Sequence, residues 1–213
     1  MRDVTSPKRV TVYVDGFNLY YGMLKRSPAL KWLDLQALAE QLAPGAVVSV
    51  RYFTARVKPL PNHPHAEAKQ RLYFRALATT PISIHYGHFT TKVTMAAVAV
   101  APGAKLRFER VYKTEEKGSD VNLGTYLLLD GVDKLYDEAI VISDDSDLAE
   151  PIEQSVKRFG PIHIISPRGM RLAAFKAAMS CRPLDANLVA GCQLPSPLTL
   201  PSGNTISRPP DWR

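Results

Sequence analysis

Aspartates crowd the stretch IVISDDSDL at residues 140–148, where an apolar run gives way to Asp144, Asp145 and Asp147. Like charges this close repel each other strongly wherever the local dielectric constant is low. They are tolerated when they point into water, cap a helix or share a bound cation. Carboxylate oxygens are hard ligands that suit Mg²⁺ or Mn²⁺ rather than zinc. The stretch is therefore a candidate metal site.

Acidic residues also stand at the ends of two other predicted elements. The strand RVTVYVD ends at Asp15, and Asp120 lies in the first turn of a helix predicted from residue 118. Ligands of open α/β sheets bind outside the carboxyl ends of the strands. These two carboxylates and those of Asp145 and Asp147 are therefore expected to converge if the two strands are neighbours. A divalent cation held there could activate water for displacement at a phosphate.

Each carboxylate also has a structural explanation. Asp15 fits a turn with the glycine that follows it, and Asp120 suits the positive end of a helix dipole. Asp147 fits a capping box with Glu150. Taken one at a time these explanations are favoured, whereas the joint supply of acids from several element ends favours a metal site.

The elements that position these residues alternate along the chain. Apolar and β-branched runs predict strands at residues 9–15, 46–56, 82–89, 137–143 and 161–166. Helical apolar spacing predicts helices at 17–27, 33–43 (capped by Asp34), 66–79, 118–132, 146–160 and 169–179. Residues 92–113 predict a hairpin that turns at Pro102-Gly103. The alternation predicts an α/β fold, with a mainly parallel sheet between two layers of helices.

One domain and a tail are expected. Residues 1–180 are predicted to form the α/β domain. Residues 181–213 are predicted to form a proline-rich tail, extended or disordered, because six prolines interrupt the periodicity from Arg182 onward. No apolar run approaches the roughly 20 residues of a membrane helix, and no signal peptide is predicted. Two cysteines without metal-ligand spacing, Cys181 and Cys192, fit a cytoplasmic protein with free thiols.

Charge is distributed unevenly along the chain. Residues 1–113 carry 17 basic and 6 acidic side chains, residues 114–180 carry 7 and 12, and the remainder carry 3 and 2. The corresponding net charges are +11, −5 and +1. This distribution is expected of a protein that grips a polyanion and holds a cation at an acidic centre. Charged faces in contact with solvent explain it equally well.

Three blocks of the sequence resemble the signature of the NYN domain. In order they are VYVDGFNLYYG, KGSDVNLGTYLLLD and AIVISDDSDLAEPIE, and the resemblance spans about residues 9–179. NYN domains belong to the PIN-like nucleases, and this chain is similar to their LabA-like branch. The resemblance implies a Rossmann-like, PIN-like α/β/α domain that cleaves RNA with Mg²⁺ or Mn²⁺. DNA is the alternative substrate, and a homodimer is expected by analogy alone.

The resemblance also implies roles for individual residues. The acids of the family's metal site fall on Asp15, Asp120, Asp145 and Asp147, and its asparagine falls on Asn18, which would hold a water or a phosphate oxygen. Asp144 stands where the family has a glycine, and it could ligate the metal, raise the pKa of a neighbour or alter the backbone. The substrate contacts expected from the basic half and the first helix are Arg51, Arg56, Lys58, Lys69, Arg71, Arg75, Lys117 and Tyr20 or Tyr21, one of these tyrosines being expected in the core.

Two other functions compete with this interpretation. A haloacid-dehalogenase-like phosphatase places a second aspartate two residues after its nucleophile, but here that position is Phe17. A non-catalytic RNA-binding module of the same fold is supported by Asp144. Such a module gains nothing from negative charge concentrated beside a phosphate groove. The sequence therefore favours a metal-dependent ribonuclease.

Overall fold

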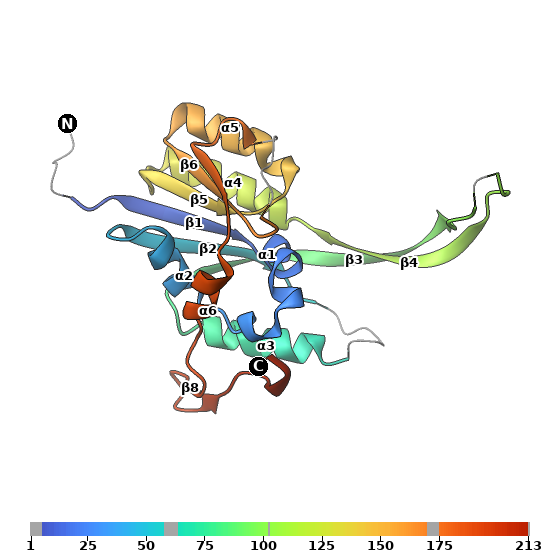
Figure 1. Cartoon of the computed structure of the whole chain (residues 1–213), viewed down its shortest axis with the longest axis horizontal. Coiled ribbons are helices and arrows are strands. Elements are labelled where there is room, and N and C mark those ends of the chain that lie inside the picture. Colours follow the sequence, from blue (N-terminus) through green and yellow to red (C-terminus); the bar gives the residue numbers. More distant parts are fainter. Residues whose placement is uncertain (1–5, 58–63, 102, 170–174, 213) are drawn as a thin grey trace.

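A seven-stranded sheet forms the centre of the protein, in a computed structural model that describes residues 6–57, 64–101, 103–169 and 175–212 (Figure 1). The strand order is β4-β3-β2-β1-β5-β6-β7, and every neighbouring pair is parallel except β3 with β4. The strands are β1 (Arg9–Asp15), β2 (Val47–Ala55), β3 (Ser83–Ala97), β4 (Phe108–Lys117), β5 (Glu138–Ile142), β6 (Ile162–Ser166) and β7 (Ser180–Pro183). The mainly parallel sheet predicted from the sequence is confirmed.

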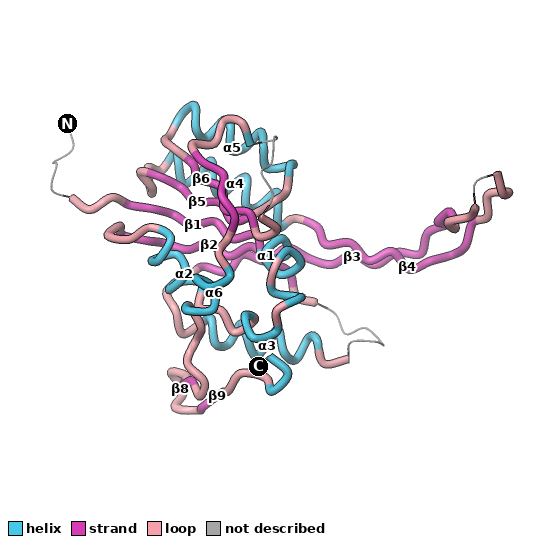
Figure 2. The backbone as a smooth tube through the Cα atoms, in the orientation of Figure 1, coloured by secondary structure: helices cyan, strands magenta, loops and turns pink. Residues whose placement is uncertain are grey.

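Helices cover both faces of the sheet, which confirms the three-layer α/β/α architecture (Figures 1 and 2). One face is covered by α1 (Gly16–Gly22), α2 (Leu35–Leu42), α3 (Ala66–Leu77) and α6 (Ala186–Gly191), and the other by α4 (Ser119–Val132) and α5 (Ala149–Arg158). Short 3₁₀ turns lie at Leu24–Arg26, Pro28–Leu30, Ser146–Leu148 and Pro210–Trp212. None of the helices within the described ranges is long and apolar enough to cross a membrane.

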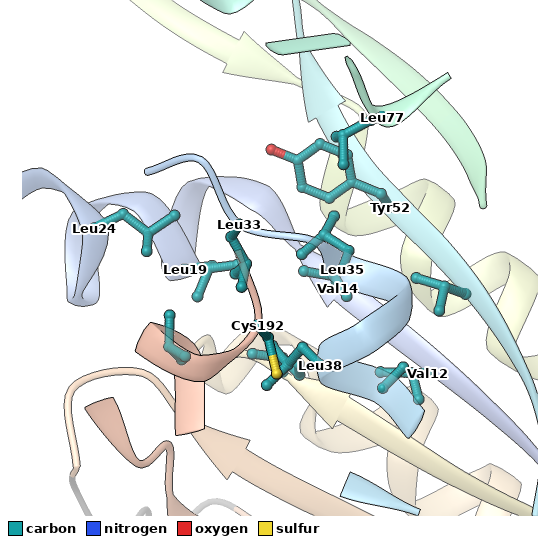
Figure 3. Packing of buried hydrophobic residues seen from close by; sticks show 14 of the residues in the cluster. Val12, Val14, Leu19, Leu24, Leu33, Leu35, Leu38, Tyr52, Leu77 and Cys192 are labelled. Atoms are coloured by element: carbon teal, nitrogen blue, oxygen red, sulfur yellow. The ribbon is translucent and has the colours of Figure 1, made fainter. Parts of the chain in front are cut away.

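The sequences of the adjacent inner strands β1 and β5 are mostly apolar, because both faces of each strand are buried. In β1, Val12 and Val14 face α1 and α2, whereas Tyr13 faces α4 and α5. Figure 3 shows the first of these layers, in which side chains from α1, α2 and α3 surround the two valines. Burial on both sides fixes the register of β1, and with it the position of the carboxyl end of the strand.

The helix predicted at 169–179 differs from the structure. Residues 170–174 lie outside the described part of the chain, and residues 175–179 form turns. Phe175 is buried, and the Met179 amide donates a 2.8 Å hydrogen bond to the carbonyl of Ile162. This contact starts the pairing of β7 with β6, so strand pairing overrides the local helical spacing.

The C-terminal segment is not the extended or disordered tail that its prolines suggested. Helix α6 is followed by the small hairpin of β8 (Leu198–Thr199) and β9 (Thr205–Ile206), and then by the last 3₁₀ turn. The apolar side chains of this segment join the core on the α1–α2 face; those that are buried are Leu184, Val189, Cys192, Leu194, Ile206 and Trp212. Both cysteines are free. The described residues after 180 therefore pack onto the α/β domain.

Trp212 anchors the end of the chain, and its replacement by alanine is expected to lower the free energy of unfolding by about 3 kcal/mol. Its ring centroid lies 6.2 Å from those of Trp32 and Tyr73, so truncation leaves a cavity in an aromatic cluster. Urea unfolding measures the loss. Asp211→Ala, which removes only the exposed ion pair to Lys69, is the control and should cost less than about 1 kcal/mol. Equal, small effects of both variants would contradict the anchoring role.

Candidate metal centre at the carboxyl edge of the sheet

Three carboxylates from separate parts of the chain meet where β1 and β5 end. The two strands are parallel neighbours, with Val14 opposite Ile142, so Asp15 and the loop after β5 leave the sheet at the same edge. Asp120 reaches this point from the first turn of α4. One carboxylate oxygen from each of Asp15, Asp120 and Asp145 lies within 4.8 Å of the others. The structure thus brings together three of the four predicted metal ligands.

Asp15 is held firmly at the end of β1. One carboxylate oxygen accepts hydrogen bonds from the amides of Phe17 (3.1 Å) and Asn18 (2.9 Å), which caps α1. The other accepts from the Asn18 side chain (2.6 Å) and from the Ser143 hydroxyl (2.8 Å). Burial raises the pKa of Asp15, while these hydrogen bonds act in the opposite direction.

Gly16 allows α1 to begin directly after Asp15. A Cβ atom at this position would lie 2.7 Å from the carbonyl oxygen of Phe53 and from the Tyr52 ring. Because α1 passes so close to β2, any side chain here would displace the helix. The sequence Asp-Gly, which suggested a turn, therefore serves a tight strand-to-helix junction that aims Asp15 at the site.

Asp120 is under electrostatic strain within the cluster. Burial, followed by the negative charges of Asp15 and Asp145 and then those of Glu116 and Asp147, raises the pKa of Asp120 to about 7. Glu116 is itself fixed, because it accepts hydrogen bonds from the amide and hydroxyl of Ser119. The turn between β4 and α4 is formed by Gly118 with a φ of 96°, a conformation that residues with a side chain rarely adopt.

The loop after β5 presents Asp145 to the cluster. Its amide donates a 3.0 Å hydrogen bond to the Ser143 hydroxyl, which in turn donates to Asp15, so one serine links both acids. The Asp145 carboxylate also accepts from the amide of Asp147 (3.0 Å). Asp147 is exposed and lies outside the group of three. Its role at the metal stays a prediction.

Asn18 orients Asp15 through its side-chain amide. Its nitrogen donates to Asp15, and its oxygen accepts a 3.4 Å contact from the amide of Asp144. The sequence anticipated a water-holding or phosphate-holding role for Asn18. The structure shows that it connects the ends of β1 and β5, and its role toward a water or a phosphate stays a prediction.

Asp144 points away from the metal centre. It is buried, and its carboxylate accepts hydrogen bonds from the hydroxyl of Ser166 and from the amide of Arg168 (2.9 Å). From the sequence, Asp144 could be a metal ligand or a charge that raises the pKa of a neighbour. The structure places its carboxylate outside the group of three acids and against Ser166 and Arg168. Asp144 joins the loop after β5 to the loop after β6.

The metal-free site should destabilise the fold, and Asp120→Asn is expected to relieve this. A pKa raised from 3.8 to about 7 means that ionised Asp120 opposes folding above its unfolded pKa, with the full effect above pH 7. With EDTA present, the variant should be more stable than wild type by about 1–2 kcal/mol at pH 7.5. The difference should shrink as the pH falls toward 4. Urea titrations at several pH values measure it, and a variant less stable than wild type at pH 7.5 would contradict the repulsion.

Arg51 is not available to a nucleic acid, contrary to the prediction. Its guanidinium makes a bidentate ion pair with Asp130, at 2.5 and 2.7 Å, and lies over the ring of Tyr126 at 4.7 Å. The pair is largely buried. Arg51 therefore links β2 to α4 inside the protein, because an arginine this close to a buried carboxylate satisfies a charge that water cannot reach.

The other basic residues predicted as contacts differ in their freedom. Arg56 lies 5.0 Å over the Tyr86 ring, Lys69 pairs with Asp211 at 2.5 Å, and Lys117 lies 3.4 Å from Glu115. Arg71 and Arg75 are exposed on α3. Lys58 lies outside the described residues.

The tyrosines of α1 are both exposed, so the expectation that one of them belongs to the core is wrong. Tyr20 is 37% and Tyr21 52% exposed. Lys31 lies 5.7 Å over the Tyr20 ring and Lys25 lies 4.9 Å over the Tyr21 ring. The helix is only seven residues long, and it buries Leu19 toward the sheet while leaving the two rings at the surface.

Two polar residues near the site were missed from the sequence. Ser143 connects Asp15 to Asp145, and Glu116 adds negative charge next to Asp120. The position of Ser143, as the first residue after the last apolar one of β5, was a usable signal. Glu116 gave none, because its place beside Asp120 depends on the path of β4.

Comparison with known proteins places the chain in a family. Residues 9–183 match the model of the NYN domain. The chain belongs to the NYN family. Members of the NYN family are generally PIN-like nucleases that use divalent metals. The acidic cluster formed by Asp15, Asp120 and Asp145 could hold such an ion.

Two further proteins are similar to this NYN chain. The curated protein 6-hydroxy-3-succinoylpyridine 3-monooxygenase HspA of Pseudomonas putida is 27% identical, over 98% of this chain and 76% of that protein. A crystal structure of a protein of unknown function from Vibrio parahaemolyticus, VPA0982, matches with a TM-score of 0.55 and 16% identity. It covers 87% of this chain and 98% of its own. That likeness shows the fold alone.

Proposed function

We propose that this NYN protein is a divalent-metal-dependent ribonuclease that hydrolyses phosphodiester bonds in single-stranded RNA. The observation that carries the proposal is the convergence of Asp15, Asp120 and Asp145, with carboxylate oxygens within 4.8 Å. Family membership supports the nuclease class, while RNA as the substrate and Mg²⁺ or Mn²⁺ as the ion are parts of the proposal.

The donor set fits a hard divalent cation. Three carboxylates offer only oxygen, which suits Mg²⁺ or Mn²⁺ better than zinc. No ion pair between these three acids and a lysine or arginine is present in the described ranges of the chain. Burial, followed by the charges of Asp15 and Asp145, raises the pKa of Asp120, and a bound cation would offset this by stabilising the ionised carboxylate.

A divalent ion held here would supply a water of lowered pKa and would neutralise charge on the scissile phosphate. The chain's own residues prepare the site for this chemistry. Asn18 and Ser143 fix the orientation of Asp15, and the Asp147 amide fixes Asp145. Such pre-positioned donors lose little freedom when an ion binds. Asp147, exposed beside Asp145, is proposed to orient the attacking water.

The substrate is proposed to approach across α1, whose exposed rings begin five residues after Asp15. Stacking of a base on Tyr20 or Tyr21 would contribute about 1–3 kcal/mol. The cations proposed to follow the phosphates are Arg56, Arg71, Arg75 and Lys117. Lys69 is included only if its exposed ion pair to Asp211 opens when RNA binds.

Cleavage of labelled single-stranded RNA and of DNA of the same sequence, with Mn²⁺, Mg²⁺ or EDTA, tests the proposal. RNA should be cut with either metal and stay intact in EDTA. Equal cutting of DNA would contradict the choice of RNA. Binding of RNA without cleavage under any metal would overturn the catalytic proposal and favour the non-catalytic binding module.

A monooxygenase is the second candidate, favoured by one observation. The similarity to the Pseudomonas putida protein spans 98% of the chain, including the C-terminal segment that lies beyond the NYN match. Incubation with 6-hydroxy-3-succinoylpyridine, dioxygen and a two-electron reductant tests this directly. Oxygen uptake and loss of the pyridine, with RNA left intact, would replace the ribonuclease proposal.

A further inference from the structure

Strands β3 and β4 extend beyond the sheet as a two-stranded ribbon (Figures 1 and 2). β3 pairs with β2 only over Ser83–Gly87, whereas its pairing with β4 continues from His88–Lys117 to Ala97–Phe108. The ribbon is ten residue pairs long, which corresponds to about 34 Å. It leaves the domain next to the acidic cluster, since β4 leads directly into α4.

The two faces of the ribbon differ in composition. Side chains of directly paired residues share a face. The first face, called here the apolar face, consists of Val93, Met95, Ala97, Phe108, Tyr112 and Arg110, with the pair Thr91–Thr114 at its inner end. The opposite face carries Lys92, Lys113 and Glu109. The ribbon is therefore amphipathic, like a strand pair with one buried side.

The apolar face is nevertheless open to solvent. Val93 is 48% exposed, Met95 56%, Phe108 55% and Tyr112 82%. A two-stranded ribbon without further cover is only marginally stable in water. Contiguous exposed apolar surface of this kind is typical of protein interfaces. The face therefore requires a partner.

The composition of the apolar face selects the kind of partner. Nucleic acids are held mainly through their phosphates, which require several cations on the contact surface. The apolar face carries a single cation, Arg110, among aliphatic and aromatic side chains. The other basic residues of the paired strands, Lys92, Lys113 and Lys117, lie on the opposite face of the ribbon. A protein surface of the same apolar character is the better match, and a second copy of the chain provides one.

We propose that the apolar face is a homodimer interface, packed against the same face of a second copy. The two ribbons run antiparallel, because the domain at the base of each ribbon is wider than a ribbon and two domains at the same end would collide. The exposed parts of Val93, Met95, Phe108 and Tyr112 together amount to roughly 500 Å² per copy, so the pair buries on the order of 1,000 Å². That area is at the lower limit for a specific interface, so the Kd is expected to be on the order of 1 µM.

The antiparallel arrangement places each ribbon tip beside the metal centre of the other copy. At the base of the ribbon, Phe89 packs edge-on against Phe17 at 5.7 Å, and Glu116 binds Ser119 beside Asp120. Both base residues lie on the same side of the ribbon as the apolar face. The dimer therefore borders the mouth of each site with the second copy's tip, which carries Lys105 and Arg107.

Analytical ultracentrifugation of the full chain across a concentration series tests the interface. Wild type should pass from monomer to dimer near micromolar concentration, whereas Val93→Glu with Met95→Glu should raise the Kd at least about 100-fold. Val111→Glu is the matched control, since Val111 is 36% exposed on the opposite face and should leave the Kd unchanged. Far-UV circular dichroism shows whether each variant is folded.

Cross-linking tests the arrangement independently of the affinity. In a Cys181→Ser background, a short bismaleimide should join two copies through Val93→Cys but not through Thr94→Cys on the opposite face. Monomeric wild type at all concentrations would overturn the proposal. So would a Val93→Glu/Met95→Glu variant whose mass is unchanged while its RNA affinity falls, because the occupant of the face would then be nucleic acid. Equal cross-linking at both positions would also overturn it.

Discussion

Asp145→Asn is expected to lower metal-dependent RNA cleavage on the order of 10³-fold while leaving RNA affinity nearly unchanged. Asp145 is one of three carboxylates whose oxygens lie within 4.8 Å of one another. The asparagine side chain is neutral, so the variant removes one negatively charged metal ligand from that group. The change is otherwise small, because the asparagine oxygen can still accept the hydrogen bond from the Asp147 amide. Single-turnover cleavage with saturating enzyme measures the chemical step apart from binding.

Asp144→Asn is the matched control for this variant. It makes the same chemical change one residue earlier, but its carboxylate binds Ser166 and Arg168 and is not one of the three clustered acids. We expect cleavage within about threefold of wild type and a loss of about 1 kcal/mol of stability. Equal losses of activity in both variants would show that the distinction between the two neighbouring acids is wrong.

Binding of Mg²⁺ can be followed without any substrate. Excess Mg²⁺ should raise the melting temperature of wild type and of Asp144→Asn, because the ion binds only the folded site. The melting temperature of Asp145→Asn should respond much less. A full response in Asp145→Asn, together with lost cleavage, would assign this residue to the chemistry but not to the metal.

The acidic centre could be predicted from the sequence because its residues stand at the ends of strongly patterned elements. Asp15 and Asp145 each follow an apolar strand, and Asp34, expected as a helix cap, accepts from the amides of Gln36 and Ala37. In such positions local sequence determines geometry. What the sequence lacked was the direction of Asp144, which depends on the neighbouring loop that contains Ser166.

Features that depend on distant partners were missed. Arg51 reads as a basic residue on a strand, and only the fold shows that α4 brings Asp130 against it. Trp212 follows a proline-rich, aperiodic segment, yet it is covered by Trp32 and Tyr73, which lie more than 100 residues earlier in the chain. Neither contact leaves a periodic signal, because each joins residues that are far apart in sequence.

Asp130→Ala is expected to lower the free energy of unfolding by about 4 kcal/mol, the largest loss of stability predicted for a single substitution here. Asp130 is 2% exposed and accepts from the Tyr13 hydroxyl at 2.6 Å as well as from Nε and Nη2 on one edge of the Arg51 guanidinium. Alanine leaves that guanidinium, whose side chain is only 21% exposed, without its counter-charge. Urea unfolding measures the loss, and Asp133→Ala, at an exposed position beyond the same helix, should cost less than about 0.5 kcal/mol.

A triple variant separates the buried charge from the packing. Tyr13→Phe, Arg51→Met and Asp130→Leu together replace the network by apolar groups of similar size, and only the partly buried His85 ring nitrogen, 3.3 Å from the guanidinium, loses a partner. We expect this variant to recover most of the stability that Asp130→Ala loses. A triple variant as unstable as the single one would show that shape, and not the unpaired guanidinium, accounts for the loss.

Asp130→Ala also shows how the core supports the metal centre. Asp130 and Asp120 lie ten residues apart on α4, about 15 Å along the helix axis, and the network of Asp130 fastens that helix to β1 and β2. Because Asp130 does not touch the acidic cluster, Asp130→Ala should keep its Mg²⁺ affinity at temperatures where it is folded. Asp120→Asn should lose that affinity while remaining folded. If Asp130→Ala instead loses Mg²⁺ binding well below its melting temperature, the network positions α4 for the metal centre as well as stabilising the fold.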